Sequence, residues 1–285
     1  MKLLLGIDVE DWFQVENLKN VIKIETWNSR ESRIERNTEL ILSLLKEKNI
    51  KATFFVVGWI AEKFPELIKK ISNDGHEIAC HGYSHLSSNQ MDEKELYIDI
   101  NKAKKILEKI VGDKIYGYRA PNFSISTGLI RILNELGFSY DSSLMDSDFI
   151  KKYNKIGNNK INCSKSFRFK NNICELQLST LKFFNRNIPW AGGAMFRFMP
   201  YSIFKKGMEK IISENGYYNF YIHPWEFDPV QPRLKKVKFK YRFRHYHNLE
   251  KTEKRFSKLL NDFSFSSYRD YLIEYPELQV VKNLL

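Results

Sequence analysis

The sequence has few cysteines and prolines and lacks any long apolar run. Its three cysteines, Cys80, Cys163 and Cys174, are an odd number at spacings that fit neither a set of disulfides nor a zinc framework. No stretch of about 18 apolar residues occurs, and the apolar residues before Asp8 are too few for a signal peptide. Because no repeat or low-complexity linker divides the chain, we expect one cytoplasmic domain over residues 1–285, with reduced thiols.

Acidic residues are scarce in the segment 233–258, which holds eleven lysines and arginines but only two glutamates and so carries +9 of the net charge of +12. From Lys236 to Arg244, basic residues alternate with apolar or aromatic ones, which predicts a strand or an extended arm with one charged face. We expect this face to contact an anionic membrane surface, a lipid-diphosphate-linked glycan or an acidic polysaccharide, with the protein peripheral at the inner membrane face. His245 and His247 in this segment are expected to be structural. Nucleic acid is not an expected partner, because no nucleic-acid-binding motif accompanies the basic residues.

Strand-like apolar runs alternate with amphipathic helical patterns along most of the chain. This alternation predicts an α/β domain with a parallel sheet or barrel, whose site lies at the carboxyl ends of the strands. The predicted strands are residues 3–7, 52–57, 76–80, 115–118, 138–140, 173–178 and 217–222. The predicted helices are residues 37–47, 62–72, 93–111, 127–135 and 201–214.

Two histidines, His81 and His85, follow the apolar run 78–80. On one helical turn, residues i and i+4 share a face, so both imidazoles could bind one metal ion. Histidine pairs at this spacing also occur as ordinary surface or core residues, and the pair alone is weak evidence for a metal.

Three carboxylates, Asp8, Glu10 and Asp11, follow the apolar run 3–7. Either they form a solvated acidic turn, or a cation offsets their repulsion. Two imidazoles and one carboxylate form the three-ligand centre of a hydrolytic metal, with a fourth position open to water. A second carboxylate then remains to accept the proton of that water. On an extended strand, residues i and i+2 point the same way, which favours Glu10 slightly over Asp11 as the partner of Asp8.

Five segments resemble, in family order, the motifs of polysaccharide deacetylases with the NodB homology domain, carbohydrate esterase family 4. These segments are residues 8–12, the pair His81 and His85, residues 119–123, Trp190, and residues 222–224. Three further segments, 192–197, 223–229 and 242–246, are similar to the subgroup associated with exopolysaccharide synthesis. The resemblance covers nearly the whole chain and implies a distorted barrel of about seven parallel strands.

The resemblance also implies a role for each matching residue. Asp8 would be the general base, Arg119 would orient it, and His223 would be the general acid that protonates the leaving amine. His81 and His85 would bind the metal with Glu10 or Asp11, because Val9 stands where the commoner family opening has a second aspartate. The residues expected to contact substrate are Pro121, Trp190 and Trp225.

The implied activity is the metal-dependent removal of N-acetyl groups from an amino sugar, in a surface polysaccharide or its lipid-linked precursor. Zinc is the first expectation for the metal, with cobalt or another divalent ion open, because imidazole and carboxylate ligands suit several of them. Two alternatives stay open: a metal-free cyclic-amide hydrolase of the same fold, and a glycan-binding protein without catalysis.

Overall fold

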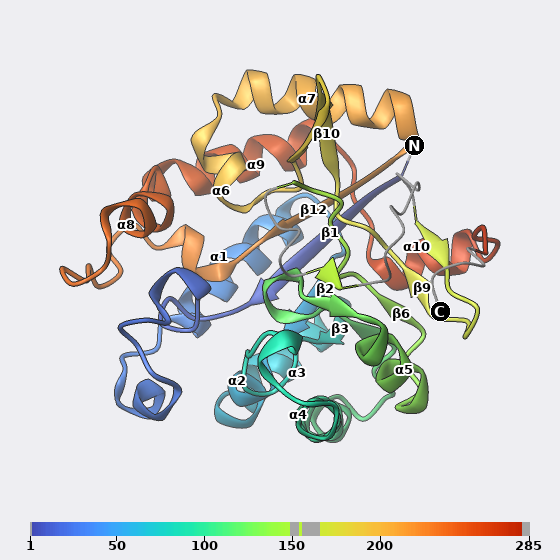
Figure 1. Cartoon of the computed structure of the whole chain (residues 1–285). Helices are drawn as coiled ribbons and strands as arrows, with labels where there is room; N and C mark the ends of the chain where they lie inside the picture. Colours follow the sequence, from blue (N-terminus) through green and yellow to red (C-terminus); the bar gives the residue numbers. More distant parts are fainter. Residues whose placement is uncertain (1, 149–153, 156–165, 281–285) are drawn as a thin grey trace.

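The main feature of the computed structural model, which describes residues 2–148, 154–155 and 166–280, is an eight-stranded sheet that curls into a half-barrel lined with helices (Figure 1). Seven strands are parallel and the eighth, β8, pairs antiparallel with β9, which confirms the predicted α/β fold and adds an antiparallel edge. In spatial order the strands are β12 (Tyr217–Ile222), β1 (Lys2–Val9), β2 (Thr53–Val56), β3 (Glu77–Cys80), β4 (Gly117–Tyr118), β6 (Tyr140–Asp141), β9 (Cys174–Glu175) and β8 (Phe167–Arg168). Cys163 lies outside the described residues.

Helices connect most of these strands, as predicted. They are α1 (Ile34–Glu47), α2 (Gly58–Lys63), α3 (Pro65–Asn73), α4 (Glu93–Val111), α5 (Thr127–Glu135), α6 (Gly193–Phe198), α7 (Tyr201–Asn215), α8 (Phe239–Tyr246), α9 (Thr252–Asp262) and α10 (Tyr268–Glu274). Two small sheets lie apart from the main one: β5 (Ile125–Ser126) with β7 (Asn154–Lys155), and β10 (Thr180–Phe183) with β11 (Arg186–Pro189). Among the described residues, no helix combines the length and apolar composition needed to span a membrane.

Local signals in the sequence explain where two helices begin and end. Helix α4 starts at a capping box in which Asp92 and Glu95 bond each other's backbone, and ends at Gly112 with a φ of 73°. Ser126 caps α5 by accepting the backbone N–H of Leu129. The predicted helix 62–72 is instead two helices that meet at Pro65, which cannot continue the first one because its ring removes a backbone N–H.

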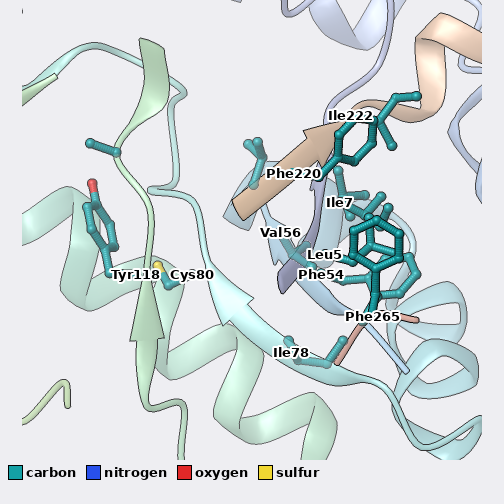
Figure 2. Close-up of a cluster of buried hydrophobic side chains, with 14 of the residues drawn as sticks. Leu5, Ile7, Phe54, Val56, Ile78, Cys80, Tyr118, Phe220, Ile222 and Phe265 are labelled. Atoms are coloured by element: carbon teal, nitrogen blue, oxygen red, sulfur yellow. The ribbon is translucent and has the colours of Figure 1, made fainter. Parts of the chain in front are cut away.

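The two faces of the sheet pack against different groups. Leu5 and Ile7 of β1 join the large core beneath the helices, together with Phe54, Val56 and Phe220 (Figure 2). The alternate residue Leu4 packs on the other face, in a cluster that includes Tyr268 of α10 and Tyr140 of β6. Because strand residues alternate between faces, Gly6 and Asp8 also belong to the Tyr268 face.

The basic segment departs from its predicted conformation. Residues 239–246 form the helix α8, whereas the alternation of charge predicted a strand or an extended arm. Packing overrides that periodicity, because the last turn of α8 carries His245 and Tyr246 into the protein, where the His245 ring stacks on Trp225 at 4.4 Å.

Candidate active site

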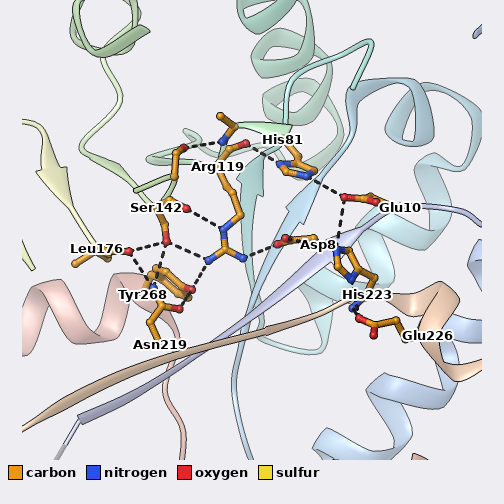
Figure 3. A network of polar contacts seen from close by, with 12 residues as sticks. Asp8, Glu10, His81, Arg119, Ser142, Leu176, Asn219, His223, Glu226 and Tyr268 are labelled. Carbon is orange, nitrogen blue, oxygen red and sulfur yellow. Dashed lines mark hydrogen bonds and ion pairs between the residues drawn. The ribbon is translucent and has the colours of Figure 1, made fainter. Parts of the chain in front are cut away.

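Most of the predicted catalytic and metal-binding residues lie close together, as Figure 3 shows for Asp8, Glu10, His81, Arg119 and His223. Asp8 and Glu10 stand at the carboxyl end of β1, and His81, Arg119 and His223 each directly follow a neighbouring strand. The strands concerned are parallel, so their carboxyl ends lie on the same edge and bring together residues up to 215 positions apart in the chain.

Glu10, His81 and His85 form a buried cluster suited to a metal ion. Glu10 Oε1 lies 2.9 Å from His85 Nε2 and 3.3 Å from His81 Nε2. All three side chains are buried, and their ligand atoms lie within 4.8 Å of one another. Burial raises the pKa of Glu10, but the charges of His85 and His223, with hydrogen bonds from His81 and His85, hold it well below its usual range.

The orientation of His81 fits metal binding. Its Nδ1 lies 2.7 Å from the backbone carbonyl oxygen of Arg119, which can only accept a hydrogen bond. If His81 binds a metal ion as a neutral imidazole, Nδ1 therefore carries the proton and the Nε2 lone pair is left for the ion. This second hydrogen bond is the usual way in which proteins set the tautomer of a metal-binding histidine.

The predicted helical turn for His81 and His85 is wrong. Residues 81–87 form a loop in which Gly82 has a φ of 68° and His85 a φ of 56°. The Asp99 carboxylate accepts the backbone N–H groups of Tyr83 and Ser84 and so holds this loop. The two imidazoles converge because the loop folds back on itself, and not through helical periodicity.

Asp11 lies outside the cluster. Its carboxylate accepts hydrogen bonds from the Ser32 hydroxyl at 2.5 Å and from the backbone N–H groups of Arg33 at 2.9 Å and Trp12 at 2.8 Å. Burial raises the pKa of Asp11, and these hydrogen bonds act against that rise. Of the two carboxylates that the sequence left open, Glu10 is the one that faces both histidines.

Asp8 is held by a buried arginine. Arg119 Nη1 donates to Asp8 Oδ1 at 2.5 Å, and the rest of the guanidinium donates to Ser142 and to the Tyr268 hydroxyl. Burial lowers the pKa of Arg119, but the charge of Asp8 outweighs it and raises that pKa above its usual value. Gly6 makes room for the guanidinium, since a Cβ there would lie 2.6 Å from Arg119 Nη1.

His223 approaches the cluster from the opposite side. Its Nε2 lies 3.7 Å from Glu10 Oε1 and 4.0 Å from Asp8 Oδ2, and its Nδ1 lies 2.7 Å from Glu226 Oε1. Burial lowers the pKa of His223, but the charge of Glu10 and the hydrogen bond to Glu226 outweigh it and raise the pKa to about 9. In this arrangement His223 carries a proton at neutral pH.

Sequence reasoning missed the pair that supports His223. Arg197 Nε donates to Glu226 Oε2 at 2.5 Å, and its remaining N–H groups donate to the backbone carbonyls of Arg244, His245 and His247. Burial raises the pKa of Glu226, but Arg197 outweighs it and the pKa falls to about 2. Both residues stand in the segments 192–197 and 223–229, but nothing in the sequence indicated that they pair.

A cavity of about 230 Å³ opens above these groups. Trp225 lines it, as predicted for a residue that contacts substrate. Trp190 does not: it is buried, its ring stacks on Phe204 at 5.6 Å, and its indole N–H donates to the Phe204 carbonyl. Pro121 is also buried and does not line the cavity, whereas its neighbours Asn122 and Phe123 do. Trp225 thus lies in the cavity wall and Trp190 in the core, and contact with substrate stays a prediction for all three residues.

The described histidines of the basic segment lie apart from the metal cluster. His245 Nε2 contacts Gln231 Oε1 at 2.8 Å, and burial lowers the pKa of His245 to about 3. The Nε2 atom of His247 contacts the Asn248 amide at 2.8 Å. Both have packing partners that suit a structural role.

Two family models match this chain, and each covers a different part of the candidate site. The family model for polysaccharide deacetylases matches residues 26–140, which include His81, His85 and Arg119. A second model, for a domain of unknown function (DUF3473), matches residues 152–273, which include His223 and Glu226. Asp8 and Glu10 precede both ranges, so the structure joins three parts of the chain in one site.

Two curated bacterial relatives match a third or more of the chain. A peptidoglycan deacetylase of Helicobacter pylori is 35% identical over 117 residues, which are 41% of this chain and 40% of that protein. A peptidoglycan-N-acetylglucosamine deacetylase of Bacillus cereus is 39% identical over 101 residues, which are 35% of this chain and 37% of that protein. The matched part thus spans about two fifths of the length of these relatives.

The fold is shared more widely than the sequence. The crystal structure of a Mycobacterium smegmatis protein, provisionally assigned as a polysaccharide deacetylase, matches with a TM-score of 0.67 at 18% identity, over 100% of this chain and 93% of that one. Residues 26–140 of the chain thus match the polysaccharide deacetylase family model, and the chain shares its fold with this structure.

Proposed function

We propose that the protein is a metal-dependent hydrolase that removes the acetyl group from an N-acetylated amino sugar. The observation that carries this proposal is the convergence of Asp8, Glu10 and His223, with His223 Nε2 4.0 Å from Asp8 Oδ2 and 3.7 Å from Glu10 Oε1. A base and an acid at this separation can serve the two proton transfers that amide hydrolysis requires.

Glu10, His81 and His85 would hold the metal. A divalent ion bound there would supply Lewis acidity toward the acetyl carbonyl and lower the pKa of a water. Zinc is the first candidate, since two imidazoles and a carboxylate match one of its usual catalytic ligand sets. Three protein ligands leave room for water and substrate on the side that faces the cavity.

In the first step, water adds to the acetyl carbonyl carbon and Asp8 accepts the proton that the water loses. Arg119 keeps Asp8 aimed at this water by binding its other carboxylate oxygen. In the second step the carbon–nitrogen bond breaks, and His223 gives its proton to the leaving nitrogen. The products are acetate and the free amine.

The substrate class rests on the relatives and on the cavity. The two curated relatives are named for deacetylation of peptidoglycan, and one of them for its N-acetylglucosamine. Phe123, Tyr221 and Tyr241 line the cavity and are partly exposed, so they offer aromatic surface to a sugar ring, whereas the buried Trp225 ring already stacks on His245. We extend the proposal to a surface polysaccharide or its lipid-linked precursor, because segments 192–197, 223–229 and 242–246 resemble the exopolysaccharide-associated subgroup.

Acetate release from N-acetylglucosamine oligomers tests the proposal. Wild type should release acetate, and Asp8→Asn should reduce the rate at least about 100-fold while the metal content stays unchanged, because only the base is lost. Asp74→Asn, at an exposed aspartate outside the site, is the matched control and should behave as wild type. Equal acetate release from Asp8→Asn and wild type would refute the role of Asp8 as base.

A further inference from the structure

One wall of the cavity comes from the basic helix α8, which packs against the segment 16–18. Tyr241 and Arg244 of α8 line the cavity beside Tyr221, and Asn17, Lys19 and Asn20 line it from this segment and the two residues after it. The remaining wall holds the proposed catalytic residues. The cavity therefore has a hydrolytic side and a second side rich in amide and cationic groups.

Three lysine and arginine side chains line this cavity, and two of them already have carboxylate partners. Lys19 pairs with Glu16, and Arg197 is buried against Glu226 and three backbone carbonyls. Arg244 is exposed, and within the described part of the chain no carboxylate lies within ion-pair distance of it. Arg197 binds the backbone carbonyl of Arg244, and the exposed side chain of Arg244 is left to a ligand in the cavity.

An acetamido group is uncharged and would leave Arg244 without a partner. Asp8 cannot be the anionic partner of Arg244, because its carboxylate is already paired with Arg119. Guanidinium groups bind carboxylate and phosphate through paired, charge-assisted hydrogen bonds, and the amides of Asn17 and Asn20 can add donors.

We propose that Arg244 binds an anionic group, a carboxylate or a phosphate, which the glycan carries next to the N-acetyl sugar. This specificity rests on the proposed deacetylase function and narrows its substrate to acidic glycans. The charge of the segment 233–258 agrees with it, since a positive surface attracts an acidic polymer toward the cavity.

Binding to matched sugars tests the proposal. One pair is the disaccharide of N-acetylglucosamine with glucuronic acid against that with glucose, and the other is N-acetylglucosamine 1-phosphate against its methyl glycoside. Calorimetry in the Asp8→Asn background avoids turnover. We expect about 3- to 10-fold tighter binding of at least one anionic sugar than of its neutral partner, and a smaller difference at high salt.

Two variants of α8 locate the effect. Arg244→Gln should bring the ratio of the two affinities close to one, whereas Arg242→Gln, an exposed arginine on the same helix outside the cavity, should keep it. A preference only in the glucuronic acid pair identifies the anion as a carboxylate, and a preference only in the 1-phosphate pair identifies it as a phosphate. No preference in either pair, or the same loss in both variants, would overturn the proposal.

Acetate release from the wild type separates this inference from the proposed function. A binding preference that depends on Arg244 without acetate release would keep the anion site and refute the deacetylase. Acetate release at equal rates from each anionic sugar and its neutral partner, with no difference in affinity, would keep the deacetylase function and refute the anion site.

Discussion

At the scale of single residues, His223 depends on two side chains that do not touch the proposed metal ligands. Glu226 accepts from His223 Nδ1 at 2.7 Å, and Arg197 lies behind Glu226 at 2.5 Å. Both partners are buried, so removing one leaves an uncompensated charge in the protein. The pair therefore serves stability and the orientation of His223 together.

Two variants separate these contributions. Glu226→Gln should lower kcat at least about 10-fold, because it weakens the hold on the His223 proton, and should cost about 3 kcal/mol of stability, because Arg197 is left unpaired. The double variant Glu226→Gln with Arg197→Met should regain part of that stability but not the rate. Measurements of kcat, KM and urea unfolding check this. If the double variant recovers full kcat, Glu226 matters only for folding.

At the scale of elements, strands β6 and β9 bring two carboxyl groups together. Asp141 and Glu175 are direct neighbours across the parallel pair and are both fully buried. Ser143 donates to one oxygen of Asp141 and the Leu144 N–H to one of Glu175, while Asp141 Oδ2 and Glu175 Oε2 are buried without a hydrogen-bond partner among the described residues. Burial raises the pKa of Glu175, and the charge of Asp141 raises it further; burial also raises the pKa of Asp141, to about 6. The pair therefore holds a proton in the folded state at a pH where the unfolded chain has lost it.

This pair predicts how stability depends on pH. Because both folded-state pKa values are raised, its contribution is fully present below the ordinary carboxyl pKa and is lost as the pH rises through the folded-state values. Glu175→Gln should therefore be more stable than wild type at pH 8.5, by on the order of 2 kcal/mol, and should lose that advantage at pH 5. Urea unfolding at both pH values measures this, with the exposed Glu135→Gln as control. An advantage that stays constant with pH would contradict a shared proton.

At the scale of the whole molecule, the proposed metal ligands tie β1 to the loop after β3, and His223 adds β12 on the other side of β1. A ligand that binds the folded state alone stabilises it by mass action. A bound metal should therefore raise the melting temperature of the whole protein as well as permit catalysis.

Metal removal tests this. Wild type should contain near one equivalent of metal, lose it with a chelator, melt at a lower temperature without it, and recover with added zinc. His85→Ala should contain little metal and show no response, whereas His247→Ala, outside the cluster, should behave as wild type. Elemental analysis and thermal melts provide the readout. Absence of metal from both wild type and His85→Ala, even after zinc is added, would favour the metal-free amide hydrolase or the glycan-binding protein.

The sequence alone was sufficient to predict an element or the place of a residue where the signal is local or lies in the order of motifs. Helices α4 and α5 begin and end as predicted, because Asp92, Ser126 and Gly112 act on their nearest backbone neighbours. The carboxyl-end placement of Asp8 and His223 also followed from the sequence, since each ends or directly follows a buried apolar strand. The prediction that relied on periodicity alone was weaker, because the alternating segment became helix α8.

Sequence by itself determined the fold class and indicated the chemical groups of the candidate site, because strand patterns and the order of motifs are written along the chain. Only the tertiary structure decided between Glu10 and Asp11, paired Glu226 with Arg197, and placed Arg244 in the cavity wall. Those choices depend on which side chains packing brings together across gaps of 29 to 75 residues, as in the Arg197–Glu226 and Glu10–His85 contacts. No local propensity or period spans such a distance.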